Sequence, residues 1–258
     1  MWRLAPLIVL CTACDTIFGL HDVGLEPQPD AFVTTLDSKL VAHYTLDELV
    51  GGNMVKDSVG HHDAICMQQG CPLPDVGHAM TGRSLVFNTD LVSATTPEYL
   101  VIVAAPDLQL APEYTIALWI RVDGVDGGCV VQQTYGTAFD NAWQLCVDPS
   151  GSPFFFSVED GVHTMLTHDG DDAPIGTWTH FALVHSTSER ILYRNGVALM
   201  RDTGGHPSFT EGAATYIGAD IDAGSNVTDP FEGAVDEVRI YARALEPSEL
   251  AQIVASDP

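Results

Sequence analysis

Basic side chains are scarce in this sequence of 258 residues. Lysine and arginine together number 10, against 35 aspartates and glutamates, so the formal charge at pH 7 is −25. The lysines are Lys39 and Lys56, and the basic residues form no cluster. Because nucleic-acid binding depends on Lys and Arg neutralising phosphates, this composition argues against a nucleic-acid partner. The same deficit argues against attachment to anionic lipids through a basic patch.

The N-terminal part also lacks an apolar run long enough to span a membrane. Leu4–Leu10 is far shorter than the roughly 20 residues of a spanning helix, and a proline interrupts it. Arg3 precedes this run, and the small residues Thr12 and Ala13 follow it. A charged start, a short apolar core and small residues are typical of an export signal, which we predict over residues 1–13.

The segment Leu10–Cys14 resembles a bacterial lipobox, in which the last cysteine is lipidated and becomes the mature N-terminus. Thr12 and Ala13 fit that pattern, whereas Cys11 stands where leucine is usual. We therefore predict an exported protein that is lipid-anchored through Cys14 to the bacterial cell envelope, in the periplasm or at the cell surface. The lipid is the only membrane attachment that we expect. An ordinary secreted protein, cut after Ala13, is the alternative.

Residues 14–39 follow no helix or strand period, and Pro27 and Pro29 stand there among polar residues. We predict that this segment is a lipidated flexible tether. A flexible chain of about 25 residues has an end-to-end distance of about 28 Å. Regular patterning begins at Leu40, and we predict one domain over residues 40–258.

Cysteine parity agrees with the lipobox interpretation. Cleavage before Cys14 leaves five cysteines, and the other four can pair inside the folded domain in an oxidising compartment. If the intervening hairpin loop lies midway between them, Cys129 and Cys146 face each other at the short separation that a disulfide needs. Cys66 and Cys71 would close a small irregular loop. Free buried thiols are the alternative.

Short strands separated by turns dominate the rest of the sequence. Every second residue from Ile116 to Val122 is apolar, as in a strand with one buried face. Asn195-Gly196 predicts a type I′ hairpin turn, and only Pro247–Ala255 is typical of a helix. This pattern predicts an all-β fold, an antiparallel two-sheet jelly-roll sandwich with a short C-terminal helix. The strands that we expect are Leu40–Leu46, Tyr99–Val103, Tyr114–Val122, Cys129–Gln133, Ala142–Val147, Pro153–Val158, Val162–Thr167, Trp178–His185, Ile191–Arg194 and Val197–Met200.

Several segments, in order along the chain, resemble those of LamG-like jelly-roll domains, which share the concanavalin A-like lectin/glucanase fold. Tyr114–Arg121 is similar to the family's "fTialWir" strand, and Phe231–Tyr241 is similar to its "f-x-G-x-iDEVriy" segment. The ordered set covers about Leu40 to Ala255. Its other members are Tyr44–Glu48 with Asp57–Gly60, Gly176–Val184, Tyr193–Gly196, Tyr216–Gly218 and Arg243–Leu245 with Glu249.

The resemblance implies two antiparallel sheets packed face to face, often stabilised by a calcium ion. In related jelly rolls, an aspartate of the final strand and acids near the first strand can join backbone oxygens in a hard-cation site, and such ligands suit Ca²⁺. Asp236 matches the first position, Asp47 lies in the opening segment, and Asp57 in the "D-x-s-G" turn is a third candidate. Alternatively, Asp236 only caps or hydrogen-bonds the adjacent strand.

Catalytic signatures are not found in the sequence. Laminarinase-type glycosidases of this fold carry Glu-x-Asp-x-x-Glu on one strand, with the acids projecting into the cleft. The acids Glu232, Asp236 and Glu237 have a different spacing, and a Gly-x-Ser-x-Gly nucleophile elbow is absent. We therefore predict that the protein is not an enzyme. A glycoside hydrolase with a laminarinase-like fold is the remaining catalytic alternative.

Aromatic side chains offer apolar faces on which sugar rings can stack. Trp143 and Tyr135, near a hairpin loop, are candidate ligand contacts, whereas Trp119 and Trp178 lie in motif strands where core packing is expected. Since one fold hosts many functions, the function must come from a site. We predict a non-catalytic cell-surface recognition module that binds a glycan or a surface protein. An adhesion or scaffolding protein with protein partners alone is the alternative.

The lipidation of Cys14 has a direct test. Cys14→Ser removes the thiol that would accept the lipid, so labelling of the full chain by a fatty-acid analogue fed to expressing bacteria should disappear. Cys11→Ser is the control, because Cys11 lies before the cleavage point and its loss should leave labelling intact. Unchanged labelling of the Cys14 variant would show that the lipobox interpretation is wrong.

Overall fold

A computed structural model describes most of the chain from residue 35 onward. The described residues are 35–48, 52–66, 70–79, 82–88, 97–110, 112–135, 140–159, 162–167, 170, 173–205, 207, 212–222 and 226–257. The export signal, Cys14 and almost all of the predicted tether lie outside the described residues. Those three assignments therefore stay predictions.

Sheet A has eight strands, in the order β14-β13-β12-β7-β18-β5-β4, with β1 paired to β18. All of its described strand pairs are antiparallel. The alternating residues of β7 from Ile116 to Val122 point into the core, as their pattern predicts. The strands are β1 (Leu40–Tyr44), β4 (Leu73–Val76), β5 (Arg83–Phe87), β7 (Tyr114–Val122), β12 (Trp178–His185), β13 (Arg190–Arg194), β14 (Val197–Asp202) and β18 (Gly233–Tyr241).

Sheet B also has eight antiparallel strands, in the order β11-β10-β9-β8-β15-β6-β3-β2. They are β2 (Met54–Val55), β3 (Ala64–Ile65), β6 (Leu100–Ile102), β8 (Gly128–Tyr135), β9 (Asp140–Val147), β10 (Pro153–Glu159), β11 (Val162–Thr167) and β15 (Thr215–Ile217). A separate two-stranded sheet consists of β16 (Asp220–Asp222) and β17 (Asn226–Thr228). A short 3-10 helix spans Pro106–Leu108.

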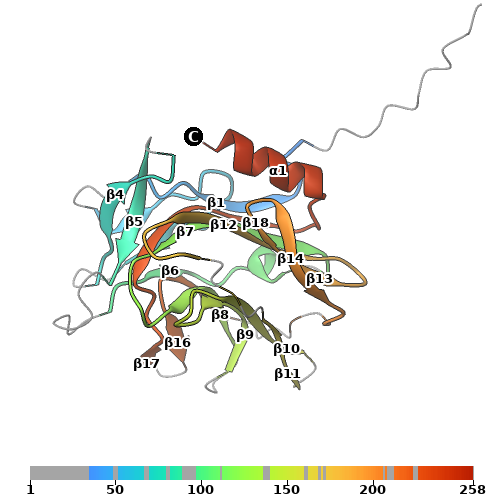
Figure 1. Cartoon of the computed structure of the whole chain (residues 1–258). Coiled ribbons are helices and arrows are strands. Elements are labelled where there is room, and N and C mark those ends of the chain that lie inside the picture. The colour runs from blue at the N-terminus through green and yellow to red at the C-terminus, as the bar shows by residue number, and fades with distance from the viewer. Residues whose placement is uncertain are drawn as a thin grey trace, which may run out of the picture. The chain divides into compact units, whose positions relative to one another are not determined.

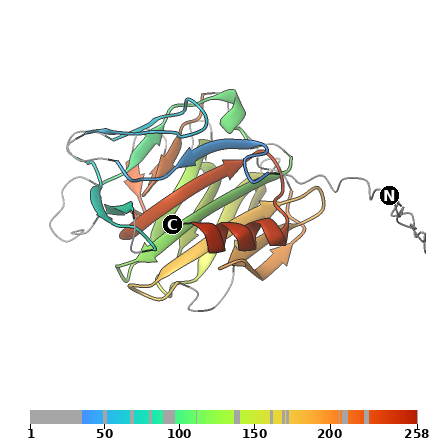
Figure 2. The same ribbon diagram turned by 90° about the horizontal axis from the view of Figure 1, so that it is seen from above.

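The two sheets face each other and bury one large apolar core between them (Figure 1). Helix α1 (Pro247–Ser256) lies across sheet A on the side away from sheet B, as Figure 2 shows from above. Its residues Leu250 and Ile253 pack there with Ala117, Ala182 and Tyr241 in a second apolar cluster. Sheet A is therefore covered by the core on one face and, over part of its area, by α1 on the other. The predicted all-β sandwich with a C-terminal helix is confirmed.

Local sequence explains where these elements turn and end. Asn195 and Gly196 have φ values of +49° and +76°, the left-handed pair that a type I′ turn requires between β13 and β14. Pro247 opens α1, because a first-turn proline loses no helical hydrogen bond. Glu246 and Glu249 form a reciprocal capping box that satisfies backbone N–H groups at this helix start.

Both predicted disulfides are present. Cys129–Cys146 joins β8 to β9 with a Cα–Cα distance of 4.0 Å, and Cys66–Cys71 closes its loop at 5.0 Å. Disulfides persist in oxidising compartments, so they indicate an exported or extracellular protein. Among the described helices, none has the length and apolarity to cross a membrane.

Arg190 connects the two sheets through a buried network. The guanidinium is 1% exposed, and it binds both carboxylate oxygens of Asp202 on β14 and Oε1 of Glu159 on β10 at 2.8 Å. It also reaches hydroxyl groups on β10 and β11 at 3.0 Å. Gly204 packs directly on it, since a Cβ there would lie 2.0 Å from the guanidinium carbon. Sheet A is thereby tied to sheet B by charge as well as by the apolar core.

Replacing Arg190 should destabilise the protein strongly. Arg190→Met keeps most of the volume but leaves the carboxylates of Glu159 and Asp202 without their counter-charge, which should cost about 3 kcal/mol. Arg201→Met is the matched control, because Arg201 is largely exposed in its pair with Glu189 and should change stability by less than about 0.5 kcal/mol. Urea unfolding followed by tryptophan fluorescence measures both. Equal stability of the two variants would contradict the stabilising role of the Arg190 network between the sheets.

Candidate functional site

A row of side chains crosses five strands on the outer face of sheet B. Each member is the direct partner of the next in the ladders that join β15, β8, β9, β10 and β11, and directly paired residues share a face. Phe155 and Ile217, which neighbour two members along their strands, point into the core, so the row points outward. The members of this outer row are Tyr216, Gln132, Gln144, Phe156 and Met165.

Phe154 and Phe156 supply aromatic surface on this face. They lie two residues apart on β10, so both point outward, and both are half-buried. His163 contacts Phe156 edge to face, with ring centroids 5.2 Å apart, and Met165 beside it is 56% exposed. This apolar area lies on the side of the sandwich opposite to α1. A ligand could reach it without moving the helix.

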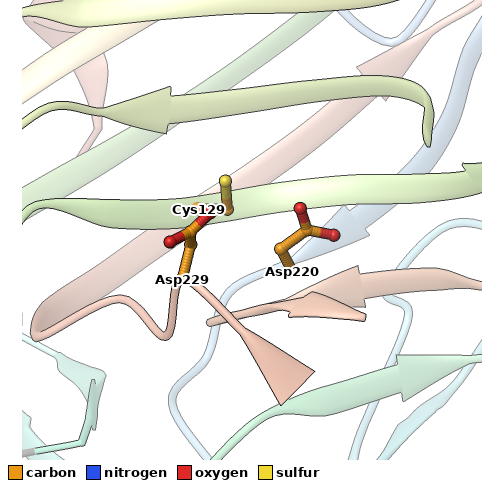
Figure 3. Close-up of side chains that lie close together, drawn as sticks. All are labelled: Cys129, Asp220 and Asp229. Atoms are coloured by element: carbon orange, nitrogen blue, oxygen red, sulfur yellow. The ribbon is translucent and has the colours of Figure 1, made fainter. Parts of the chain in front are cut away.

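Two carboxylates lie on the same face, that of Asp220 on β16 and that of Asp229 directly after β17. The side-chain N–H of Gln132 donates to the backbone oxygen of Ile221 at 3.4 Å, which ties β16 to β8. One oxygen of Asp220, one oxygen of Asp229 and the sulfur of Cys129 all lie within 4.8 Å of one another (Figure 3). Asp220 is 6% exposed, whereas Asp229 is exposed to solvent. The pair therefore has a buried member and an accessible one.

Asn141 connects this carboxylate pair to the outer row. Its amide nitrogen donates to Oδ1 of Asp220 at 2.9 Å and to Oε1 of Gln144. Burial raises the pKa of Asp220 to about 6, the charges of Asp222 and Asp229 add to this effect, and the hydrogen bond from Asn141 opposes it. The side-chain oxygen of Asn141 is buried without a hydrogen-bond partner, and so is that of Gln132.

This arrangement places oxygen-rich groups beside an aromatic surface. Carboxylates and amides can accept hydrogen bonds from hydroxyl groups, and aromatic rings can pack against the apolar faces of a ligand. Carboxylate oxygens can also bind a hard cation. Cys129 cannot take part as a metal ligand, because its sulfur is held in the disulfide and cannot become a thiolate.

The three aspartates predicted to bind calcium lie elsewhere, each with its own protein donors. Asp47 accepts the backbone N–H of Arg83 at 2.7 Å, and Asp236 accepts the backbone N–H and ring nitrogen of His78 at 3.1 and 2.8 Å. Asp57 accepts several donors, including the backbone N–H of His43 at 3.0 Å. Among the described residues these three do not converge into a ligand group. They do not fit a shared ion, and calcium binding there stays a prediction.

The prediction that Trp143 contacts a ligand is wrong. Its side chain is fully buried in the core between the sheets, and its strand neighbour Gln144 occupies the outer face instead. The alternation of Trp143, Gln144 and Leu145 could have predicted this, because in such a strand the polar residue faces solvent and its two apolar neighbours face the core. Tyr135 is half-buried and packs against the core, and its contact with a ligand stays a prediction.

Sequence reasoning missed the outward aromatic pair and the Asp220–Asp229 pair. The run Phe154-Phe155-Phe156 is apolar at every position, so its alternation could not show which rings point outward. Asp220 stands 79 residues from its partner Asn141. No short-range pattern connects residues so far apart, and only the paired sheets bring them together.

Comparison with known families gives one clear match. A family model described as the concanavalin A-like lectin/glucanases superfamily matches residues 97–251, which is more than half of the chain. The matched segment includes all strands of the outer row and both carboxylates of the pair. No curated protein matches the sequence.

Several solved binding domains have a similar fold. The binding domain of Paraclostridial Mosquitocidal Protein 1 aligns with a TM-score of 0.64 and 14% identity, over 86% of this chain and 53% of that one. The binding domain of botulinum neurotoxin DC, solved in complex with rat synaptotagmin II, aligns with a TM-score of 0.63 and 10% identity, over 86% and 52%. Botulinum neurotoxin type C, described as interacting with two ganglioside molecules, aligns with a TM-score of 0.63 and 11% identity, over 86% and 52%. This chain spans about half the length of each, and at these identities the likeness concerns the fold.

Asp220 should make the stability of the protein depend on pH when a chelator is present. Its pKa in the folded protein, about 6, lies above the usual 3.8, so the protonated form favours folding. That contribution is complete below pH 3.8 and is lost as the pH rises through about 6. Asp220→Asn removes this titration and keeps an oxygen for Asn141. The free energy of unfolding of the variant should be higher than that of the wild type by about 2–3 kcal/mol at pH 7, and nearly equal to it at pH 4. Urea unfolding in EDTA measures both.

Asp75→Asn is the control for this experiment, with the opposite sign. Its backbone hydrogen bond with Val76, together with Arg121, holds the pKa of Asp75 below its usual value. Its replacement should therefore cost stability at pH 7 and less at pH 4. A difference between the wild type and Asp220→Asn that is the same at both pH values would contradict the raised pKa.

Proposed function

The chain belongs to the concanavalin A-like lectin/glucanases superfamily, and we propose that it is a non-catalytic recognition module that binds a glycan on the outer face of sheet B. The observation that carries the proposal is the outer row, where Phe156 stands beside the amide of Gln144 on a face that α1 leaves uncovered. Ligand sites commonly combine apolar area with a few polar groups that orient the ligand. This face has both.

The chemistry of the face favours a sugar that carries no negative charge. Phe154 and Phe156 offer ring faces to the C–H side of a pyranose, and Gln144 and Asp229 offer hydrogen-bond partners to its hydroxyl groups. The protein carries a formal charge of −25, and an acidic glycan would meet repulsion from Asp220 and Asp229 unless a cation stood between them. Neutral glycans are therefore the first class to test.

Similar folds supply support for a binding role and for both classes of partner. The neurotoxin domains with this fold include one solved with a protein receptor, synaptotagmin II, and one described with gangliosides. For this chain, a surface protein that uses the exposed side chains of Val162 and Met165 is the alternative partner. The aromatic and amide pairing on neighbouring strands favours the glycan.

A glycoside hydrolase is the second candidate, because the superfamily includes glucanases and one observation favours it. Asp220, with a pKa raised to about 6, stands beside the solvent-exposed carboxylate of Asp229, as an acid stands beside a nucleophile in many glycosidases. Against it, Asp220 is 6% exposed and bound by Asn141, which leaves little access to a glycosidic oxygen.

The cellular setting is part of the proposal. We place the module outside the cytosol, anchored through lipid on Cys14 and carried on the tether of residues 14–39. Its partner would then lie on the cell envelope or just beyond it. The disulfides Cys66–Cys71 and Cys129–Cys146 support the oxidising compartment that this setting supplies.

A glycan array with the full chain tests the proposed ligand class. The wild type should bind one family of neutral glycans, and Phe156→Ala should weaken that binding roughly tenfold, because a truncated contact at the centre of a site costs more than about 1 kcal/mol. Leu73→Ala is the matched control, since Leu73 is 55% exposed on sheet A and should leave binding unchanged.

Each other outcome selects a different function. If the wild type binds no glycan on the array but captures a surface protein, and Met165→Arg abolishes that capture, the partner is a protein and not a glycan. Release of reducing sugar from a polysaccharide, lost in both Asp220→Asn and Asp229→Asn, would make the protein a hydrolase. Equal binding by Phe156→Ala and the wild type would place the glycan site on another face.

A further inference from the structure

Strand β11 is an edge strand of sheet B, and we propose that it pairs with β11 of a second copy of this chain. In this dimer the two strands run antiparallel about a two-fold axis at Met165, and the two copies of sheet B join into one sheet. The inference goes beyond the proposed function, because the dimer forms without a glycan.

The other edge strands of the two large sheets are protected against such pairing. An edge strand exposes backbone N–H and C=O groups, and natural proteins protect it with charge, proline or a short length. β14 ends on Arg201 and Asp202, β4 contains Pro74, and β2 has only two residues. At the edge of β1, the backbone N–H of Ser58 donates to the backbone oxygen of His43 at 2.8 Å. Pairing with another chain is therefore disfavoured at these four strands.

β11 lacks all of these protections. Its six residues, Val162–Thr167, include no Asp, Glu, Lys, Arg or Pro, and they pair with β10 without a register shift. Among the described residues, its backbone hydrogen bonds go to β10 alone. The apolar side chains of Val162 and Met165 are 62% and 56% exposed. A regular, uncharged edge with exposed apolar side chains is a template on which another strand can pair.

The charge of the protein selects the place where two copies can meet. Each copy carries a formal charge of −25, so contact through an acidic part of the surface brings carboxylates together. The residues of β11 are formally neutral, so pairing it with its own copy places no like charges opposite each other in the ladder. The remaining repulsion is long-range, and salt screens it over about 8 Å at physiological ionic strength. A second copy therefore fits this edge.

The two faces of β11 limit the register of the dimer. Met165 points outward and Leu166 points into the core, and directly opposite residues of a ladder share a face. With Met165 opposite its own copy, His163 faces Thr167 on the outer side and Thr164 faces Leu166 on the inner side. A register centred on Thr164 also matches the faces, but it leaves the two Met165 side chains apart. The Met165 register is favoured because it buries these exposed apolar side chains against each other.

This dimer extends the outer row from one copy into the other. Met165 is the member of the row on β11, so the Met165 pair joins the two rows end to end. Phe156 of one copy then lies three strand spacings, about 14 Å, from Phe156 of the other. If the proposed function holds, a long glycan contacts both copies at once. Pairing uses the β11 edge of each copy, so the two-fold symmetry is closed and association ends at two chains.

Sedimentation velocity of the full chain, without any glycan, measures the dimer directly. Contact between two strand edges is smaller than a permanent interface, so we expect a Kd of about 10–100 µM in about 0.15 M NaCl. Raising NaCl from about 0.05 M to about 0.5 M should lower Kd about threefold, because salt screens the repulsion between the two acidic chains. Hydrogen exchange of the backbone amides of residues 163–167 should become slower as the protein concentration rises through Kd.

Two charge variants of Met165 test the register. Met165→Lys and Met165→Glu each replace an apolar pair at the axis by two like charges, so each variant alone should dimerise about tenfold more weakly. An equimolar mixture of the two variants should form the mixed dimer, because lysine then faces glutamate. Both monomers should stay folded, since position 165 is exposed. Leu73→Lys is the matched control and should dimerise as the wild type does, because Leu73 is 55% exposed on β4, at the opposite side of the sandwich (Figure 1).

A wild type that stays monomeric throughout this concentration range, or that grows beyond two chains, would overturn the proposal. So would a dimer that salt dissociates, a Met165→Lys variant that dimerises as the wild type does, or a mixture of the two charge variants that stays monomeric. Failure of the glycan array leaves these measurements unaffected, so the two proposals fail separately.

Discussion

The register of β8 against β9 decides which side chains of sheet B reach solvent. Successive side chains of a strand point to opposite faces, so a slip of one residue would exchange the core set for the outer set. The Cys129–Cys146 disulfide pins these two strands where their Cα atoms are 4.0 Å apart. Gln144 therefore points outward and Trp143 inward. The outer row and the contact between Asn141 and Asp220 both depend on this register.

The outer faces of the two sheets are covered to different extents by the rest of the chain. On sheet A, α1 covers one part, and a polar network covers another: Trp119 stacks on His78 with ring centroids 4.3 Å apart and donates its N–H to Asp257. On sheet B, half-buried aromatic residues and amides remain at the surface beside β16. The recognition face that we propose is therefore on sheet B, because a ligand on sheet A would have to displace packed structure.

Scarce positive charge shapes the electrostatics of the whole protein. Arg190 is used to join the sheets, Arg239 binds Glu237 and Asp257, and Arg243 binds Glu249. Each of these guanidinium groups is thereby committed to a structural pair. Asp220 on β16 is held by the amide of Asn141 instead, and this local excess of negative charge favours cations and neutral hydroxyl groups over anions as ligands on that face.

Short-range chemistry made much of this fold predictable from the sequence. The alternation along β7, the positive-φ turn at Asn195–Gly196 and the proline at the start of α1 each act over a few residues, and each appears where its pattern predicts. The pairing of Cys129 with Cys146 could be predicted for the same reason, because counting residues outward from a hairpin loop identifies the residues that face each other.

Only the tertiary structure decided the candidate site. Asn141 and Asp220 are 79 residues apart and meet because β16 packs beside β8 and β9, a contact that no local pattern encodes. Long-range packing likewise places Asp236 in contact with His78, whereas Asp47 binds the backbone N–H of Arg83. In a strand that is apolar at every position, such as Phe154–Phe156, the packing of the opposite sheet likewise decides which side chains are buried in the core. The sequence therefore determined the elements and their turns, and the packing of distant strands determined which side chains can bind a ligand.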